Sequence, residues 1–315
     1  GRMTTIHDVA KRSGYSVSTV SRVLNQKKHV SKEARQAIES AIQALDYVPN
    51  DLARDLSQGK NFHIGIVLQH TKHPYFIELL NGMIDCAFST VYRLVLLPSE
   101  YDEKVEMEYL EQLRGKAFDA LIFTSRGVDL DRLVDYATYG PIICSENPQR
   151  TDLQAVYLNR QEAYEEAFRW FQLKGKKDIL LLLSRQYEAS VTSQAVIKAY
   201  QAVFGQYPKE SQIISGVTTY EEGFLLGERL ARMASVEGIM ANVDDVAAGI
   251  TAAYQQAKCP PPVMVGQGNQ WSSQLLHFST IDHHLYDLGY RSLEMAIGAC
   301  EQTQIELCST FIARE

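Results

Sequence analysis

The chain has 315 residues, of which 45% are hydrophobic and 22% charged, an ordinary composition for a folded protein of two or three domains. This composition excludes intrinsic disorder, collagen and coiled coil. No apolar run reaches the roughly 18 residues that span a bilayer, and the amino terminus lacks a signal peptide's apolar core, so we expect a cytoplasmic protein without a membrane partner. The five cysteines lie far apart without a C-x-x-C pair, so neither disulfides nor a structural zinc site are expected.

The net charge of −7 is unevenly distributed along the chain. Residues 1–60 hold ten Lys/Arg against six Asp/Glu, a net of +4, which leaves −11 for the remainder. Only the amino-terminal part is therefore suited to bind a polyanion such as nucleic acid. A basic head on an acidic body is the first indication of function.

Three short helices are predicted in this basic head. A capping box that begins at Thr5 predicts a first helix, which Gly14 ends. Ser16 is expected to cap a second helix that follows a tight turn and runs to about residue 24, and Ser31 is expected to cap a third. Two short helices joined by a glycine-containing turn form a helix-turn-helix.

The second helix has a surface suited to DNA. Short hydroxyl side chains can approach phosphate closely, and Arg22 can fork onto guanine N7 and O6. The hydroxyl residues are Ser16, Ser18, Thr19 and Ser21. A small three-helix packing module without a nucleic-acid partner is the alternative interpretation.

These residues resemble a known family. The headpiece and hinge of the lactose-repressor/galactose-repressor family of bacterial transcription regulators are similar to Ile6-x-Asp8-Val9-Ala10-x-x-x-Gly14-x-Ser16-x-x-Thr19-Val20-Ser21-Arg22-Val23-Leu24-Asn25 and to Leu45-x-Tyr47-x-Pro49-Asn50-x-x-Ala53-Arg54-x-Leu56. Ser13 and Tyr15 depart from the usual Ala and Val of the turn, which affects packing more than docking. The resemblance implies a headpiece over 3–48, a hinge over 49–60 and an effector-binding and dimerisation body over 61–315.

The resemblance also implies that the second helix enters the major groove. Base edges would face Val17, Ser18 and Arg22, and phosphates would lie near Ser16, Thr19, Ser21 and Asn25. Thr5 and Ser31 complete the DNA-contacting set of the headpiece. For Val17 a core role is an equal alternative, because it lies three residues before Val20.

The hinge segment has good helix formers but is too short to be helical alone. In the family such hinges fold when paired across a dimer on DNA, where a leucine wedges into a minor-groove step. Leu56 occupies that place, and Asn50 and Ala53 are the other hinge residues expected at DNA. Asp55 is a departure that disfavours phosphate contact. A plain flexible linker over 50–60 is the alternative.

Beyond residue 61, short apolar runs alternate with helical stretches, which predicts an α/β body. Fully buried parallel strands are expected over 64–68, 94–97, 120–123 and 141–144, with helices beginning near Tyr75, Glu103 and Asp129. A second series is expected over 155–158, 179–183, 212–214, 238–240 and 263–265. Two such series predict two doubly wound lobes, with a ligand cleft beyond the carboxyl ends of their strands.

The body resembles the family's effector domain, which is itself similar to periplasmic sugar-binding proteins. The resemblance implies three crossings between the lobes, with the segment from about His283 to Cys308 in the first lobe and Phe311 to the end in the second. The expected effector-binding residues are His73, Tyr75, Phe76, Ser125, Glu146, Asn147, Asp244, Asn269 and Trp271. Three have ordinary alternatives: Asn269 as a helix cap, Trp271 as packed core and Glu146 as a solvated side chain.

Two departures concern the ligand. The Arg that forks onto sugar hydroxyls in many relatives falls on Val196, and the Asp that commonly follows the late strand falls on Gly268. Buried hydroxyls without partners are costly, so we expect a small polar effector held differently, an unusual saccharide or derivative ahead of a common monosaccharide.

The common enzyme motifs do not occur in the sequence: the chain has no P-loop, no dinucleotide fingerprint, no G-x-S-x-G and no H-E-x-x-H. An α/β enzyme would need a catalytic constellation, and a periplasmic receptor would need a signal peptide and no DNA head. The prediction is therefore a ligand-responsive, sequence-specific DNA-binding regulator, a repressor of a carbohydrate or related catabolic operon, without cofactor or metal.

The expected assembly is a homodimer on a pseudo-palindromic operator, because symmetric oligomers read symmetric sites. The sequence lacks the leucine-heptad tail that assembles tetramers in some relatives. The segment 105–113 is a candidate interface because relatives use that region, with ordinary surface packing as the alternative.

Overall fold

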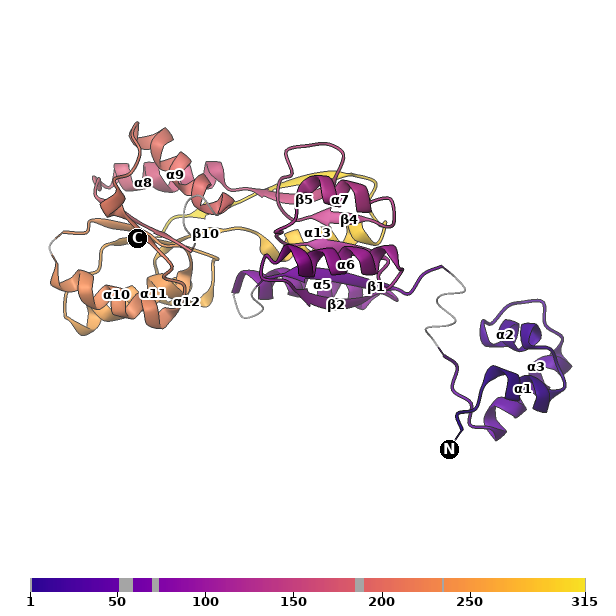
Figure 1. Cartoon of the computed structure of the whole chain (residues 1–315). Coiled ribbons are helices and arrows are strands. Elements are labelled where there is room, and N and C mark those ends of the chain that lie inside the picture. Colours follow the sequence, from indigo (N-terminus) through magenta and orange to yellow (C-terminus); the bar gives the residue numbers. More distant parts are fainter. Residues whose placement is uncertain (1, 51–58, 70–73, 185–189, 234, 315) are drawn as a thin grey trace.

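The computed structural model describes residues 2–50, 59–69, 74–184, 190–233 and 235–314 (Figure 1). The chain forms a helical headpiece and two α/β lobes joined by extended segments that run between them. This arrangement is the predicted fold class: a helix-turn-helix headpiece on a periplasmic-binding-protein-like body.

The headpiece consists of α1 (Ile6–Ser13), α2 (Val17–Leu24) and α3 (Lys32–Ala44). Each helix begins at the predicted hydroxyl cap: Thr5 forms a full capping box with Asp8, Ser16 accepts from the N–H of Thr19, and Ser31 accepts from that of Ala34. Gly14 ends α1 in the left-handed region, at φ 78°. Val9, Val20 and Ile38, one from each helix, are fully buried at the centre of this domain.

The first lobe contains a parallel sheet of six strands in the order β11-β5-β4-β3-β1-β2. Alternate side chains of β1 point to opposite faces: Ile64 and Ile66 pack toward α5 and α13, and Val67 packs toward α6 and α7. The elements are β1 (His63–Leu68), α5 (Pro74–Phe88), β2 (Arg93–Pro98), α6 (Glu103–Arg114), β3 (Ala120–Phe123), α7 (Leu130–Tyr136), β4 (Ile142–Cys144), β5 (Gln154–Asn159), α13 (Leu285–Ala296) and β11 (Gln304–Cys308).

The second lobe repeats the plan with the strand order β12-β10-β9-β8-β6-β7, parallel except for the β10–β12 pair. One face packs against α8 and α9 and the other against α10 and α11. The elements are α8 (Gln161–Leu173), β6 (Ile179–Leu183), α9 (Val191–Phe204), a 3-10 turn (Glu210–Gln212), β7 (Ile213–Ser215), α10 (Tyr220–Arg232), β8 (Gly238–Met240), α11 (Asp244–Gln256), β9 (Val263–Gln267), α12 (Trp271–Leu276), β10 (Ser279–Asp282) and β12 (Thr310–Ile312).

Two expectations about the strands are corrected. The strand over 155–158, placed with the second series, belongs to the first sheet as β5, because it pairs with β4 and β11. The strand over 94–97 is not fully buried: β2 lies at the edge of its sheet, and Leu96 is 46% exposed.

The chain crosses between the lobes three times, after β5, after β10 and between β11 and β12. These crossings agree with the ones that the resemblance implies, and they bring the carboxyl-terminal strand β12 back to the second sheet.

In each lobe, one pair of helices makes its closest approach through glycine. A Cβ added at Gly289 of α13 would overlap the carbonyl oxygen of Leu79 in α5, and one at Gly82 of α5 would overlap the carbonyl of Tyr286. In the second lobe, Gly249 of α11 lies in the same way against the carbonyl of Tyr220 in α10. A backbone carbonyl cannot move aside as a flexible side chain can. Any residue other than glycine at these positions would therefore force the two helices apart.

We therefore expect Gly289→Ala to lower the free energy of unfolding of the first lobe by about 1–3 kcal/mol. Denaturant unfolding followed by circular dichroism measures this. Gly115→Ala is the matched control, because Gly115 has an ordinary backbone conformation at the end of α6 and no atom nearer than 3.4 Å to an added Cβ. Equal stability of the two variants would show that the close approach of α13 to α5 does not require glycine at position 289.

Candidate DNA-binding and effector-binding sites

The start of α2 presents a cluster of exposed hydroxyl groups. The Oγ of Ser16 lies 3.0 Å from Ser18 Oγ and 2.8 Å from Thr19 Oγ1, and it accepts from the N–H of Thr19 at 3.2 Å. The first turn of α2 contains no acidic residue, so nothing opposes the partial positive charge of the helix amino terminus. Such an end attracts a phosphate oxygen.

The remaining headpiece candidates fall into two groups. Arg22 is exposed on α2, and Asn25, at its end, donates to Ser21 Oγ at 3.4 Å while its Oδ1 is buried without a partner. Thr5 and Ser31 are exposed, and both serve as helix caps. Val17 is half-buried and packs against the headpiece core, which favours the core role given above as its alternative. Part of its surface is still exposed to solvent.

Of the hinge candidates, only Asn50 lies within the described residues, where it is exposed. Ala53 and Leu56 lie outside them, as does the effector candidate His73.

The body carries unpaired buried polar atoms where parallel strands end. They are Gln69 Nε2 after β1, Ser125 Oγ after β3, Ser145 Oγ after β4 and Asn242 Oδ1 after β8. Together with Asn25 Oδ1 of the headpiece, these are all the buried side-chain polar atoms without a hydrogen-bond partner among the described residues. A buried polar atom without a partner costs about 1–3 kcal/mol, so its persistence requires an explanation such as a ligand or water.

Of these four residues, only Ser125 was predicted from the sequence. Gln69, Ser145 and Asn242 were missed, although each directly follows an apolar strand run, a signal that could have been used. Asn242 also donates to Ser184 Oγ and to the carbonyl of Val217, which leaves its amide oxygen as the free group.

Aromatic and charged side chains border the first-lobe part of this region. Tyr75 packs edge-on against Phe76, with ring centroids 5.0 Å apart. Burial raises the pKa of the Tyr75 phenol, and nearby Arg160 and Glu146 act on it in opposite directions. Glu146 is half-buried and lines a small recess with Ser125.

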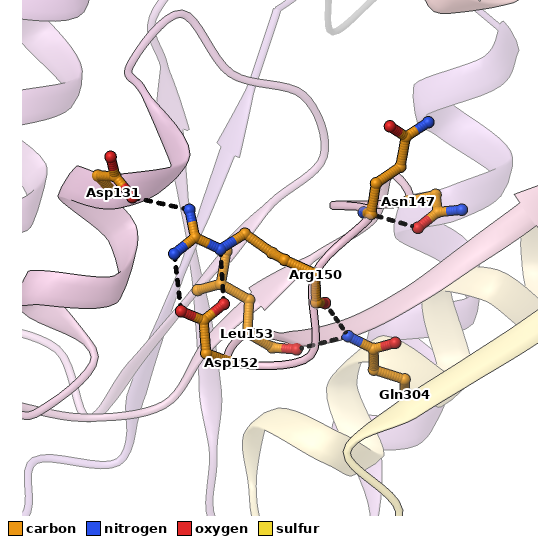
Figure 2. Close-up of polar contacts among 7 residues, drawn as sticks. Asp131, Asn147, Arg150, Asp152, Leu153 and Gln304 are labelled. Carbon is orange, nitrogen blue, oxygen red and sulfur yellow. Dashed lines mark hydrogen bonds and ion pairs between the residues drawn. The ribbon is translucent and has the colours of Figure 1, made fainter.

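The loop that carries Glu146 and Asn147 is fixed by polar contacts with α7 and β11 (Figure 2). The guanidinium of Arg150 binds both oxygens of Asp152 at 2.6 and 2.7 Å and one oxygen of Asp131 in α7 at 2.7 Å. Gln304 of β11 donates to the carbonyls of Arg150 and Leu153, as Figure 2 shows. Asn147 is exposed, and its Oδ1 accepts from the N–H of Gln149 within the same loop.

Asp244 has a different place from the one expected. It is fully buried at the start of α11, and its carboxylate accepts from the N–H of Gln270 at 2.8 Å and from the hydroxyl of Thr280 at 2.7 Å. Burial raises the pKa of this carboxyl, and these hydrogen bonds oppose that shift. In this structure Asp244 is a structural tie that joins the start of α11 to Gln270 and to Thr280 of β10.

The other second-lobe candidates also lie in structural roles or at the surface. Asn269 donates to Asp282 and accepts from Arg314, so its amide is already engaged. Trp271 is 76% exposed at the start of α12, beside the equally exposed Leu275, which contradicts the packed-core alternative and does not fit the wall of a pocket. Val196 packs in the second-lobe core, so the position of the usual arginine offers no polar group.

Within the described part of the chain, no helix combines the length and apolar character that a membrane crossing requires. The same residues contain no group of three His, Cys, Asp or Glu side chains arranged to hold a metal ion.

Comparison with known proteins accounts for both halves of the chain. Residues 5–50 match the bacterial regulatory proteins of the lacI family, and residues 61–268 match the periplasmic binding proteins and sugar binding domain of the LacI family. Catabolite control protein B of Bacillus subtilis is 35% identical over 93% of this chain and 94% of its own length, and the ribose operon repressor of Halalkalibacterium halodurans is 29% identical over 96% and 92%.

Solved structures show the same fold. The lac repressor dimer bound to operator and the anti-inducer ONPF superposes with a TM-score of 0.78 at 18% identity, covering 99% of this chain and 98% of that one. A LacI family regulator from Silicibacter pomeroyi gives 0.81 at 19% identity, with the same coverage. The chain therefore belongs to the LacI family of bacterial regulatory proteins, and it is a ligand-responsive DNA-binding transcription regulator rather than an enzyme.

Proposed function

We propose that the cleft beyond the strand ends binds a small, hydroxyl-rich effector, a saccharide or derivative, and that this binding changes the affinity of the headpieces for an operator. The observation that carries the proposal is the set of unpaired buried atoms at Gln69, Ser125, Ser145 and Asn242. A saccharide hydroxyl both donates and accepts, so it can satisfy the amide donor of Gln69, the acceptor of Asn242 and the serine hydroxyls alike.

Relatives support this class of ligand. One is named a ribose operon repressor, and solved structures of related fold hold glucose, sucrose or cellobiose. Because the usual arginine and aspartate positions hold Val196 and Gly268, we expect the present effector to be held by the four residues above and by Tyr75 and Glu146. To change DNA binding, it must bind the two lobe arrangements unequally.

A thermal-shift screen of sugars, sugar phosphates and polyols tests this proposal. A compound that stabilises the protein should bind at least about tenfold more weakly to Ser125→Ala and to Asn242→Ala, because each change removes one buried hydrogen bond. Ser89→Ala, in an exposed turn after α5, is the control and should bind normally. A compound that binds all four proteins equally would place the effector elsewhere.

We infer that the regulator acts as a homodimer that binds DNA through two headpieces. The first-lobe surface formed by α5 and β2 exposes Ile84, Phe88, Val91 and Leu96, and a cluster of exposed large apolar side chains is typical of a protein–protein interface. Helix α6 is a weaker candidate, because its apolar residues Leu110 and Leu113 are buried in the core. The proposed boundaries remain 3–48 for the headpiece, 49–60 for the hinge and 61–315 for the body.

Arg22→Ala should weaken binding to an operator selected from random duplexes by about 10- to 100-fold per headpiece and relax discrimination at one G·C pair in each half-site, because a forked arginine–guanine contact is worth about 1–3 kcal/mol. Fluorescence anisotropy with single-base operator variants measures both effects. Arg12→Ala is the control, since Arg12 is an exposed cation on α1 rather than on α2. An equal loss on every duplex would make Arg22 a phosphate contact instead.

A further inference from the structure

The two sheets of the body meet at a single residue in the third crossing. The last paired position of the first sheet there is Cys308 of β11, opposite Asn159, and the first of the second sheet is Thr310 of β12, opposite Asp282. Ser309 alone lies between them, and it is 8% exposed. Within this crossing, a change in the angle between the lobes must therefore be accommodated at or next to Ser309.

Ser309 bonds to both lobes. Its backbone N–H donates to the carbonyl of Asn159 at 3.0 Å, which extends the ladder of the first sheet by one bond. Its hydroxyl lies 2.7 Å from Nδ1 of His283, the residue that directly follows β10 of the second sheet. The hydroxyl contact links the second and third crossings.

The opposite nitrogen of His283 is also bonded. Its Nε2 lies 2.7 Å from Oε1 of Gln267 at the end of β9, and the hydroxyl of Tyr164 in α8 donates to the same oxygen at 2.9 Å. The amide nitrogen of Gln267 donates to the carbonyl of Ala241 at 3.0 Å, which fixes the amide orientation. The amide oxygen can only accept, so Nε2 carries a proton, and in the neutral imidazole Nδ1 then accepts from the Ser309 hydroxyl.

We propose that His283 and Ser309 are positioning residues that join the crossings to the second lobe and thereby set how readily the lobes change their relative angle. The imidazole, as its neutral Nε2–H form, bonds Ser309 on one side and Gln267 on the other. The inference deepens the proposed function, since lobe movement is the step by which an effector would act on DNA binding.

The surroundings of His283 favour the neutral form. Burial lowers the pKa of the imidazole well below its ordinary value, and the neighbouring Arg160 and His284 act in the same direction. Tyr164 packs edge-on against the ring, 6.1 Å between centroids, and adds no charge.

Long-range ¹H–¹⁵N spectroscopy of the wild-type imidazoles tests the proton assignment without any effector. We expect His283, identified by its absence from His283→Asn, to remain neutral with its proton on Nε2 from pH 8 to 5.5. Titration near pH 6.5, or a proton on Nδ1, would overturn the proposal. Failure of the effector screen leaves this measurement unaffected, so the two proposals fail separately.

Hydrogen exchange tests the hydrogen bonds of Ser309 in the third crossing. Ser309→Ala should speed exchange of the amide at position 309 by about tenfold, because one hydrogen bond is worth roughly that factor, and should change the dissociation constant for the selected operator by at least about threefold. Ser309→Thr, which keeps the hydroxyl, should restore both. Ser292→Ala removes another buried hydroxyl, one that bonds within α13, and should alter neither. The proposal would be overturned if exchange of the amide at position 309 is unchanged, or if that exchange speeds up while operator affinity stays the same.

Discussion

Raising monovalent salt from about 50 to 200 mM should weaken operator binding by at least about a thousandfold, because a dimer that neutralises roughly six to ten phosphates releases as many counterions. The basic residues of the head supply the contacts, with Arg22 exposed on α2 and Lys27 and Lys28 exposed in the segment that follows it. The body cannot compensate, since the residues after 60 carry a net −11. The whole electrostatic attraction therefore falls on the small head.

Anisotropy titrations at five salt concentrations give the slope of log affinity against log salt, which should be about −0.9 for each phosphate contacted. Lys28→Gln should make this slope shallower by about one per headpiece and weaken all duplexes alike. Lys104→Gln, an equal charge change on α6 of the body, should leave the slope as it is. A flat salt response, or equal affinity for every duplex at fixed salt, would contradict the DNA-binding mode.

The headpiece could be predicted almost residue by residue because its signals are local. Helix caps at Thr5, Ser16 and Ser31 act on amides two or three residues away, and each one appears in the structure where the sequence placed it. The first-lobe helices expected near 75, 103 and 129 likewise begin within one residue of those positions, at Pro74, Glu103 and Leu130.

The strand β5 could not be assigned to the correct sheet by the same means. A run such as Ala155–Leu158 is equally apolar in either lobe, and only its pairing with β4 and β11 decides its membership. β11 itself begins at Gln304, 145 residues after β5 ends, and the alternation of polar and apolar residues over Gln304–Cys308 does not identify β5 as its partner. Partners distant in sequence are invisible to periodicity.

The effector site was the least predictable part. Asp244 was expected as a ligand contact because the resemblance to the family's effector domain implies one there, yet in the structure Thr280 and Gln270 donate hydrogen bonds to its buried carboxylate. Conversely, Gln69 became a candidate only once its amide oxygen was seen to be occupied by the N–H of Tyr101, which leaves its Nε2 unpaired. Whether a polar side chain is satisfied depends on loops that converge in space, and composition carries no trace of that.

The loops after β2 and β3 converge on one buried carboxylate, that of Glu106. Glu106 of α6 is fully buried, and it accepts from the hydroxyl of Ser99 at 2.8 Å, from the N–H of Gly127 at 2.8 Å and from that of Val128 at 3.1 Å. Ser99 precedes Tyr101, whose N–H fixes Gln69, and Gly127 follows Ser125 by two residues. Glu106 thus ties together the loops after β2 and β3 that support two of the proposed effector contacts.

Glu106→Ala should therefore lower the free energy of unfolding of the first lobe by about 3 kcal/mol or more, because several buried donors lose their acceptor at about 1–3 kcal/mol each. Denaturant unfolding measures this loss, and hydrogen exchange should show the amides of Gly127 and Val128 newly unprotected. Glu108→Ala removes the same charge from the solvent-facing side of α6 and should shift stability by no more than about 0.5 kcal/mol. If the two variants unfold alike, the carboxylate does not hold the loops. If Glu106→Ala loosens the loops after β2 and β3, the displaced loop can no longer present the Ser125 hydroxyl at the strand end. Any compound that binds Ser125→Ala more weakly than the wild type should then also bind Glu106→Ala more weakly.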